Sequence, residues 1–219
     1  MKKWAAAAGI VCTLLPSLAS AQVISLAPSQ PAVRTLQHVS RRTLRKQMQA
    51  LFDARATMRA ESDIPLKSVY QSSDYNLSIR YPDQWQQKEL QQKSDNLTLL
   101  VMFLSPLEGA DTVRENVNVV IEDTASTPVS LQQYSALGIQ KEEAFFTSFH
   151  LFDSEDVTIA GRPAHRVTYT ATFQRQTLKF RQVWMLRGTQ AFVWTFADTP
   201  EFFDAHVGIF ERMLGTLTM

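Results

Sequence analysis

The feature that most constrains the fold is a series of short apolar segments separated by turn residues, running from residue 65 to the C-terminus. Residues 75–81 alternate polar and apolar side chains, whereas residues 97–104 form an unbroken apolar run. Alternation with period two predicts a strand with one buried face, and the apolar run predicts a strand buried on both faces. Residues 117–121 alternate again and predict a third strand. The chain is therefore expected to build a sheet.

Further strands are expected nearer the C-terminus. Residues 157–159 predict a short strand that enters a tight turn at 161–163, and period-two alternation continues through residues 165–173. The segments 178–186 and 191–197 are rich in branched and aromatic residues and are separated by a few turn residues. Because strands joined by short turns pair as hairpins, we expect the sheet to be antiparallel.

Two helices are expected beside this sheet. Ser130 is a candidate N-cap for a helix whose apolar residues keep helical spacing as far as Phe149, with one interruption at Gly138. Thr199 is expected to cap a final helix that begins at Pro200. The buried stripe of that helix is predicted to contain Phe202, Phe203, Val207, Phe210 and Leu214. The predicted fold class is α+β, an antiparallel sheet flanked by helices.

Residues 1–21 are typical of a cleavable export signal. Lys2 and Lys3 precede the apolar run 4–15, which is too short to span a bilayer, and small residues lead up to Ala21. The single cysteine, Cys12, lies inside this segment, so cleavage leaves a chain without disulfides or thiolate ligands. We expect the mature protein to be periplasmic.

Residues 22–64 predict a basic helical arm and linker in front of a domain at 65–219. The stretch 29–60 carries seven basic residues and one acidic residue, and residues 32–64 lack Gly and Pro. The charged surface of the arm is represented by Arg41, Arg42, Arg45 and Lys46. Three roles remain open: docking on the acidic domain or on a second copy, contact with an anionic membrane surface, and binding of another protein. Nucleic acid is not an expected partner.

The sequence from about residue 70 to residue 219 resembles the PsbP family, named for an extrinsic subunit of photosystem II. The most specific match is the block from Arg114 to Asp123, Arg-Glu-Asn-Val-Asn-Val-Val-Ile-Glu-Asp, which follows Ser105-Pro106-Leu107-Glu108-Gly109. Tyr81 to Trp85 also resembles the opening strand and turn of that family. The resemblance, which extends to the wider group of Mog, PsbP and DcrB folds, implies an antiparallel sheet sandwiched by helices. It also implies a non-enzymatic role.

Four residues of the matching block form the candidate binding site: Arg114, Glu115, Asn116 and Asn118. Because residues two apart in a strand share a face, the amides of Asn116 and Asn118 are expected to point the same way. They could form a recognition face. The alternative is structural, with Arg114 paired to Glu115 and the amides bonded to loop backbone.

Other candidate chemistry is weaker. His38, His150, His165 and His206 lack the paired spacing of a helical zinc site. His150 precedes an acidic stretch that could bind a divalent cation, although a solvated turn after a helix explains it better. His165 is expected to be a structural histidine. We therefore predict no catalytic residues, no metal site and no cofactor.

The expected function is that of a non-enzymatic periplasmic PsbP-like protein that binds or supports another envelope component as an adaptor, chaperone or assembly factor. One alternative is a photosystem II-type extrinsic protein that binds calcium. Another is a carrier of a metal or of a small apolar ligand, with a cavity lined by Phe145, Phe149, Trp184 or Trp194. A hydrolase would instead gather His165 or His206 with carboxylates in a concave pocket.

Overall fold

The computed structural model describes residues 64–94, 96–106, 114–126, 128–173 and 176–219. The expected export signal, residues 1–21, lies outside the described residues. So does the expected arm up to residue 63, with Arg41, Arg42, Arg45 and Lys46. Within the described ranges, no helix is long and apolar enough to cross a membrane.

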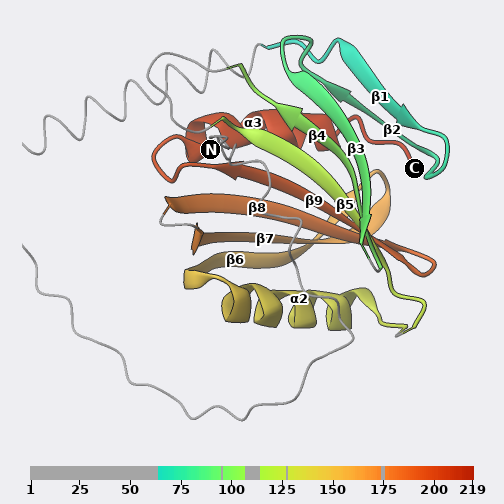
Figure 1. Ribbon diagram of the computed structural model, residues 1–219, viewed down its shortest axis with the longest axis vertical. Coiled ribbons are helices and arrows are strands. Elements are labelled where there is room, and N and C mark those ends of the chain that lie inside the picture. Colours follow the sequence, from blue (N-terminus) through green and yellow to red (C-terminus); the bar gives the residue numbers. More distant parts are fainter. Residues whose placement is uncertain (1–63, 95, 107–113, 127, 174–175) are drawn as a thin grey trace, which may run out of the picture.

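The domain is built on a curved antiparallel sheet with a separate hairpin beside it (Figure 1). The hairpin pairs β1 (Ser68–Ser72) with β2 (Leu77–Tyr81). The larger sheet has the order β3-β4-β5-β9-β8-β7-β6, and each neighbouring pair is antiparallel. Its strands are β3 (Gln86–Ser94), β4 (Leu97–Leu104), β5 (Asn116–Asp123), β6 (Thr147–Ile159), β7 (Arg162–Phe173), β8 (Gln176–Arg187) and β9 (Gln190–Asp198).

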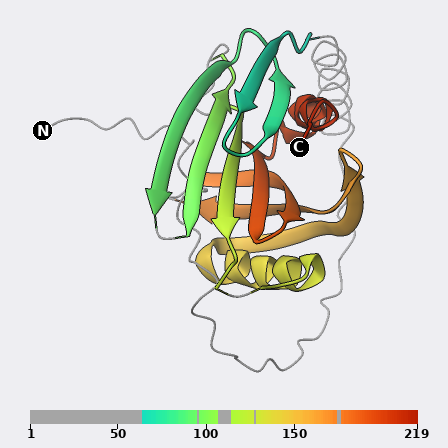
Figure 2. The same ribbon diagram turned by 90° about the vertical axis from the view of Figure 1, so that its right-hand side faces the viewer.

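Two helices pack on this sheet from different sides, α2 (Leu131–Phe145) and α3 (Phe203–Leu214) (Figures 1 and 2). Strand residues alternate between two apolar clusters, because successive side chains point to opposite faces. Val183 and Met185 join the cluster that contains α3, whereas Trp184 packs with α2. This arrangement confirms the predicted α+β class with an antiparallel sheet flanked by helices.

Helix α2 begins where the sequence predicts. The Ser130 side chain accepts a hydrogen bond from the Gln133 backbone, and the Gln133 side chain accepts one from the Ser130 backbone, which completes a capping box. Gly138 faces Trp184, and a Cβ atom at this position would lie 2.8 Å from the indole ring. The missing side chain is therefore what lets the helix approach the sheet so closely.

The last helix starts later than predicted. Its first residue is Phe203 rather than Pro200, because the backbone N–H groups of Phe202 and Phe203 both donate to the Thr199 carbonyl in a preceding turn. The prediction that Phe202 joins the buried stripe is wrong, since 42% of it is exposed, whereas Phe203 and Phe210 are fully buried.

The prediction for residues 146–156 is also wrong. Helix α2 ends at Phe145, and β6 occupies Thr147–Ile159, so Phe149 lies in a strand and the supposed acidic turn after His150 belongs to the same strand. Phe146 ends the helix in an extended conformation, which redirects the chain into the sheet. The tight turn expected at 161–163 is shorter, since Pro163 already pairs with Thr158.

Candidate functional site

The four residues of the predicted binding site lie at the start of β5, but they serve different neighbours. Arg114 donates to the backbone carbonyls of Leu104 and Ser105, which ties the segment before β5 to the end of β4. Glu115 bonds with His206 on α3. The predicted site is therefore divided between a backbone clamp and a contact with the last helix.

Asn116 and Asn118 point to the same side of β5, as predicted, but each is only 2% exposed. The Asn118 amide donates to the Asn116 side chain, and the Asn116 amide donates to the Arg114 carbonyl, each over 3.5 Å. A partner on the surface cannot reach amides buried to this degree. The Asn116 amide bonds to backbone, as the structural alternative predicts. The pairing of Arg114 with Glu115 that this alternative also predicts is replaced by the contacts of Arg114 with backbone carbonyls and of Glu115 with His206.

Glu115 forms a compact cluster with two residues that are distant in sequence. Asp198 ends β9 and His206 lies on α3, and the ligand-competent atoms of all three residues lie within 4.8 Å of one another. His206 Nδ1 is 2.8 Å from Asp198 Oδ2 and 3.2 Å from Glu115 Oε1. The exposed fractions of the side chains are 13% for Glu115, 2% for Asp198 and 12% for His206, so the cluster is largely shielded from water.

The two carboxyl groups respond differently to this environment. Burial disfavours the charge of Glu115, but hydrogen bonds from His206 and Ser105 outweigh burial and lower its pKa. Burial raises the pKa of Asp198, and the charge of Glu115 adds to that rise despite the contact with His206. Neighbouring carboxylates in one shielded site thus compete for a single imidazole.

A second histidine lies on the opposite side of the sheet, in a hydrogen-bond chain with a serine and an aspartate. His165 Nε2 is 2.9 Å from Ser154 Oγ, and His165 Nδ1 is 2.6 Å from Asp156 Oδ1. This order of contacts matches the Ser-His-Asp triads of hydrolases. However, Ser154 and Asp156 lie on the edge strand β6, and 88% of the Asp156 side chain is exposed. Cross-strand pairing explains the same contacts without catalysis.

Polar side chains form a buried row between the sheet and α2. Asn118, Thr195 and Gln182 are cross-strand neighbours in β5, β9 and β8, and each is at most 2% exposed. Glu142 of α2, also 2% exposed, lies near Gln182 and Tyr169. Among the described residues, Asn118 Oδ1, Thr195 Oγ1, Gln182 Nε2 and Glu142 Oε2 have no partner at hydrogen-bond geometry.

Burial raises the pKa of Glu142 to about 7, and the nearby polar groups of Tyr169 and Gln182 offset only part of that rise. The carboxyl group therefore changes protonation near neutral pH. This site was not predicted from the sequence. Glu142 is followed by the exposed Glu143, and two adjacent acidic residues on a helix are usually taken to face solvent.

The side chains expected to line an apolar cavity do not share one site. Trp184 packs in the cluster beneath α2, whereas Trp194 lies in the cluster around α3. Phe145 is 37% exposed. This distribution counts against a carrier whose cavity is lined by these aromatic rings.

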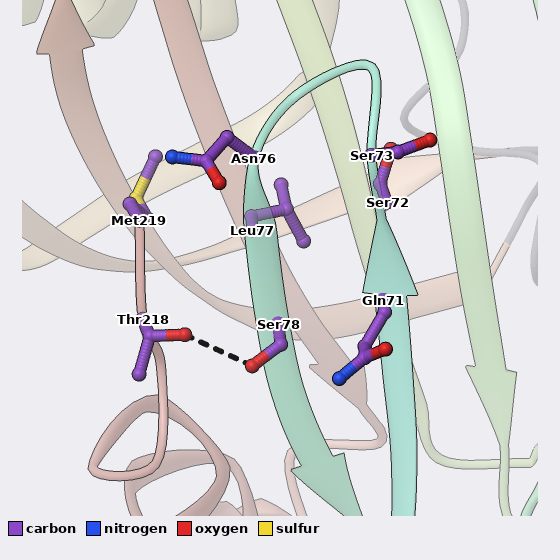
Figure 3. A pocket seen from close by; sticks show the side chains of 8 residues that line it. All are labelled: Gln71, Ser72, Ser73, Asn76, Leu77, Ser78, Thr218 and Met219. Atoms are coloured by element: carbon purple, nitrogen blue, oxygen red, sulfur yellow. Dashed lines mark hydrogen bonds between the residues drawn. The ribbon is translucent and has the colours of Figure 1, made fainter.

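An open polar groove lies where the β1–β2 hairpin meets the C-terminus (Figure 3). Its volume is about 700 Å³. It is lined by Gln71, Ser72, Ser73, Asn76, Leu77, Ser78, Thr218 and Met219. The Ser78 and Thr218 hydroxyls lie 2.9 Å apart, and their backbones exchange two hydrogen bonds, so the chain end is fixed against β2.

No protein-family model matches the chain, and no curated protein matches it. Several solved structures are similar. Cyanobacterial PsbP (CyanoP) from Synechocystis is 12% identical with a TM-score of 0.52, and the match covers 69% of this chain and 91% of CyanoP. PA94 from Pseudomonas aeruginosa, a protein of unknown function, is 21% identical with a TM-score of 0.49, and the match covers 69% of this chain and 96% of PA94.

A further similar structure is LpqN of Mycobacterium tuberculosis, described as involved in cell envelope biogenesis. It is 11% identical with a TM-score of 0.41, and the match covers 68% of this chain and 96% of LpqN. The similarity to CyanoP spans nearly the whole of that protein. The domain described here therefore has the PsbP-like fold that the sequence resemblance predicts.

Proposed function

We propose that the protein is a non-enzymatic component of the bacterial cell envelope, exported by residues 1–21, which binds or supports another envelope component. The export pattern of the sequence and the PsbP-like fold support this role. The observation that carries it is the open groove between the β1–β2 hairpin and the C-terminus.

The chemistry of this groove suits a polypeptide partner. Gln71, Ser73 and Asn76 are exposed, and their amide and hydroxyl groups can donate and accept hydrogen bonds. An extended segment of another protein presents alternating N–H and C=O groups that match such a lining. A small apolar ligand would find few apolar groups there, since Leu77 is 4% exposed and directed into the core.

The test is capture of envelope proteins with the mature chain, followed by measurement of the dissociation constant for each captured protein. We expect Ser73→Arg, which places a long charged side chain in the groove, to weaken binding at least tenfold. The matched control is Ser126→Arg, an exposed serine outside the groove, which should bind like the wild type.

A variant without residues 29–60 separates the groove from the basic arm. If only this variant loses binding, the partner contacts the arm and not the groove. A negatively charged membrane surface is then the competing partner of the arm. Equal affinity of all variants for every captured protein would contradict both contacts.

A second candidate function is hydrolysis of an ester or amide, favoured only by the contact order Ser154–His165–Asp156. It predicts labelling of the wild type by a fluorophosphonate, which reacts with activated serines, and no labelling of Ser154→Ala. An unlabelled wild-type protein would remove this candidate and leave the binding role in place.

A further inference from the structure

We infer that Glu115, Asp198 and His206 bind a divalent transition-metal ion of the zinc class. The three side chains come from three separate parts of the fold: the residue before β5, the last residue of β9, and the first half of α3. A bound ion would therefore connect the centre of the sheet to the last helix.

The spacing of the ligand atoms fits one ion. Zinc bonds to imidazole nitrogen and to carboxylate oxygen are roughly 2.0–2.2 Å long, so two ligand atoms on one tetrahedral ion lie about 3.3 Å apart. The observed separations from His206 Nδ1 are 2.8 Å to Asp198 Oδ2 and 3.2 Å to Glu115 Oε1. The separation from Asp198 is shorter than the spacing on a tetrahedral ion, so these two side chains would move slightly apart when an ion binds among the three atoms.

The donor set favours a transition metal over magnesium or calcium. Magnesium and calcium take oxygen ligands, whereas an imidazole nitrogen with two carboxylates suits zinc, cobalt or manganese. Two carboxylates also balance the charge of a divalent ion in a site that is largely shielded from water. Three protein ligands leave one tetrahedral position for water or for a ligand group from a partner.

Neighbouring groups hold the ligands in a suitable orientation. The Thr199 backbone N–H donates to Asp198 Oδ1 over 2.6 Å, so the other oxygen of this carboxylate faces His206. The Phe202 ring is stacked on the His206 imidazole, with 6.0 Å between centroids and 18° between planes. Such outer contacts position metal ligands in known sites and strengthen binding.

The competing explanation is a structural cluster in which a protonated His206 bridges two carboxylates. Both explanations use the same contacts, and they differ in what happens when metal is added. Only a metal site predicts saturable binding of one ion per chain that depends on all three side chains.

The experiment uses the full mature chain, stripped of metal with a chelator and titrated with Zn²⁺ by calorimetry. We expect one ion per chain. At an ion concentration of a hundred times Kd, we expect the melting temperature to rise by about 5–10 °C. Co²⁺ in place of Zn²⁺ should give the visible absorption of a low-symmetry nitrogen and oxygen site.

Glu115→Gln and His206→Gln each remove a ligand while keeping the side-chain size, and each should weaken Zn²⁺ binding at least tenfold. The matched control is His165→Gln, which alters the other histidine–aspartate pair and should bind Zn²⁺ like the wild type. Circular dichroism without metal verifies that each variant is folded. An unfolded variant is replaced by Asp198→Asn.

Absence of saturable Zn²⁺ binding by the wild type would overturn the inference. Equal binding by the wild type and by Glu115→Gln and His206→Gln would also overturn it. Equal binding combined with loss in His165→Gln would place the ion at the edge strand instead.

Discussion

The two sides of the sheet bury carboxyl groups among different partners. On the α3 side, Glu115 and Asp198 share the imidazole of His206, and the pKa of Glu115 is lowered. On the α2 side, Glu142 has neutral polar neighbours, and burial raises its pKa to about 7. His206 thus lowers the pKa of Glu115 despite its burial, although the pKa of the neighbouring Asp198 is still raised. The neighbours of Glu142 are uncharged and offset only part of the effect of its burial.

Removing His206 should have the largest effect, because it leaves two buried carboxyl groups without their basic partner. We expect His206→Ala to lower the free energy of unfolding by about 3–5 kcal/mol, measured by urea denaturation with a chelator present. Asp156→Asn is the control, since it breaks a histidine contact whose carboxylate is 88% exposed, and it should cost less than about 1 kcal/mol. Equal losses of unfolding free energy in the two variants would show that burial does not make the His206 contacts stronger than the His165 contact.

Glu142→Gln should remove a pH dependence that the wild type shows. The pKa is raised in the folded state, so the folded protein retains this proton at pH values where the unfolded chain has lost it. Its contribution to stability is full below about pH 4.5 and is lost as the pH rises through about 7. The total loss is on the order of 3 kcal/mol.

The measurement is the free energy of unfolding of both proteins between pH 5 and pH 8.5. The free energy of unfolding of Glu142→Gln should rise relative to that of the wild type as the pH increases. The exposed neighbour Glu143 provides the matched control, and Glu143→Gln should follow the wild-type curve. Parallel curves for the wild type and Glu142→Gln would show that the carboxyl group titrates normally.

A glycine of α2 tests how closely this helix approaches the sheet, and an exposed glycine of α3 provides the control. Gly138→Ala places a methyl group against the buried Trp184 ring and should lower the free energy of unfolding by about 1–3 kcal/mol. Gly208→Ala on α3 meets no atom within 4 Å and should raise it by up to about 1 kcal/mol through helix propensity. Thermal denaturation of both variants is sufficient, and a stabilised Gly138→Ala protein would contradict close packing of α2.

The sequence predicted the central strands well because their side chains are buried in regular patterns. β4 is the unbroken apolar run, and β8 and β9 form the predicted hairpin. The edge strands were harder to predict from the sequence. β3 reads Gln-Gln-Lys-Glu-Leu-Gln-Gln-Lys-Ser, which has no apolar face, and its extended form comes from pairing with β4. β6 has half-buried apolar residues and the exposed Phe152, and none of its residues is buried, so its pattern is weak and Phe149 was assigned to the preceding helix.

The candidate site was predicted only in part. Glu115 was singled out within the block that resembles the PsbP family, and His206 was considered as a partner for carboxylates. Nothing in the sequence joined them to Asp198, because the three positions span about ninety residues. A strand end followed by a helical histidine is a weak signal without knowledge of which strand lies beside β5.

Local patterns by themselves determined the fold class, the positions of the central strands along the chain and the capped start of α2, since these depend on side-chain periodicity and on hydrogen bonds between near neighbours. Only the tertiary structure decided which polar groups are buried and which partners they contact. The pairing of β5 with β9 brings Asn116 opposite Ala197, and this register places Glu115 beside Asp198 and under His206. The physical reason is that burial and charge pairing depend on distances in space, which strand pairing sets between residues far apart in the chain.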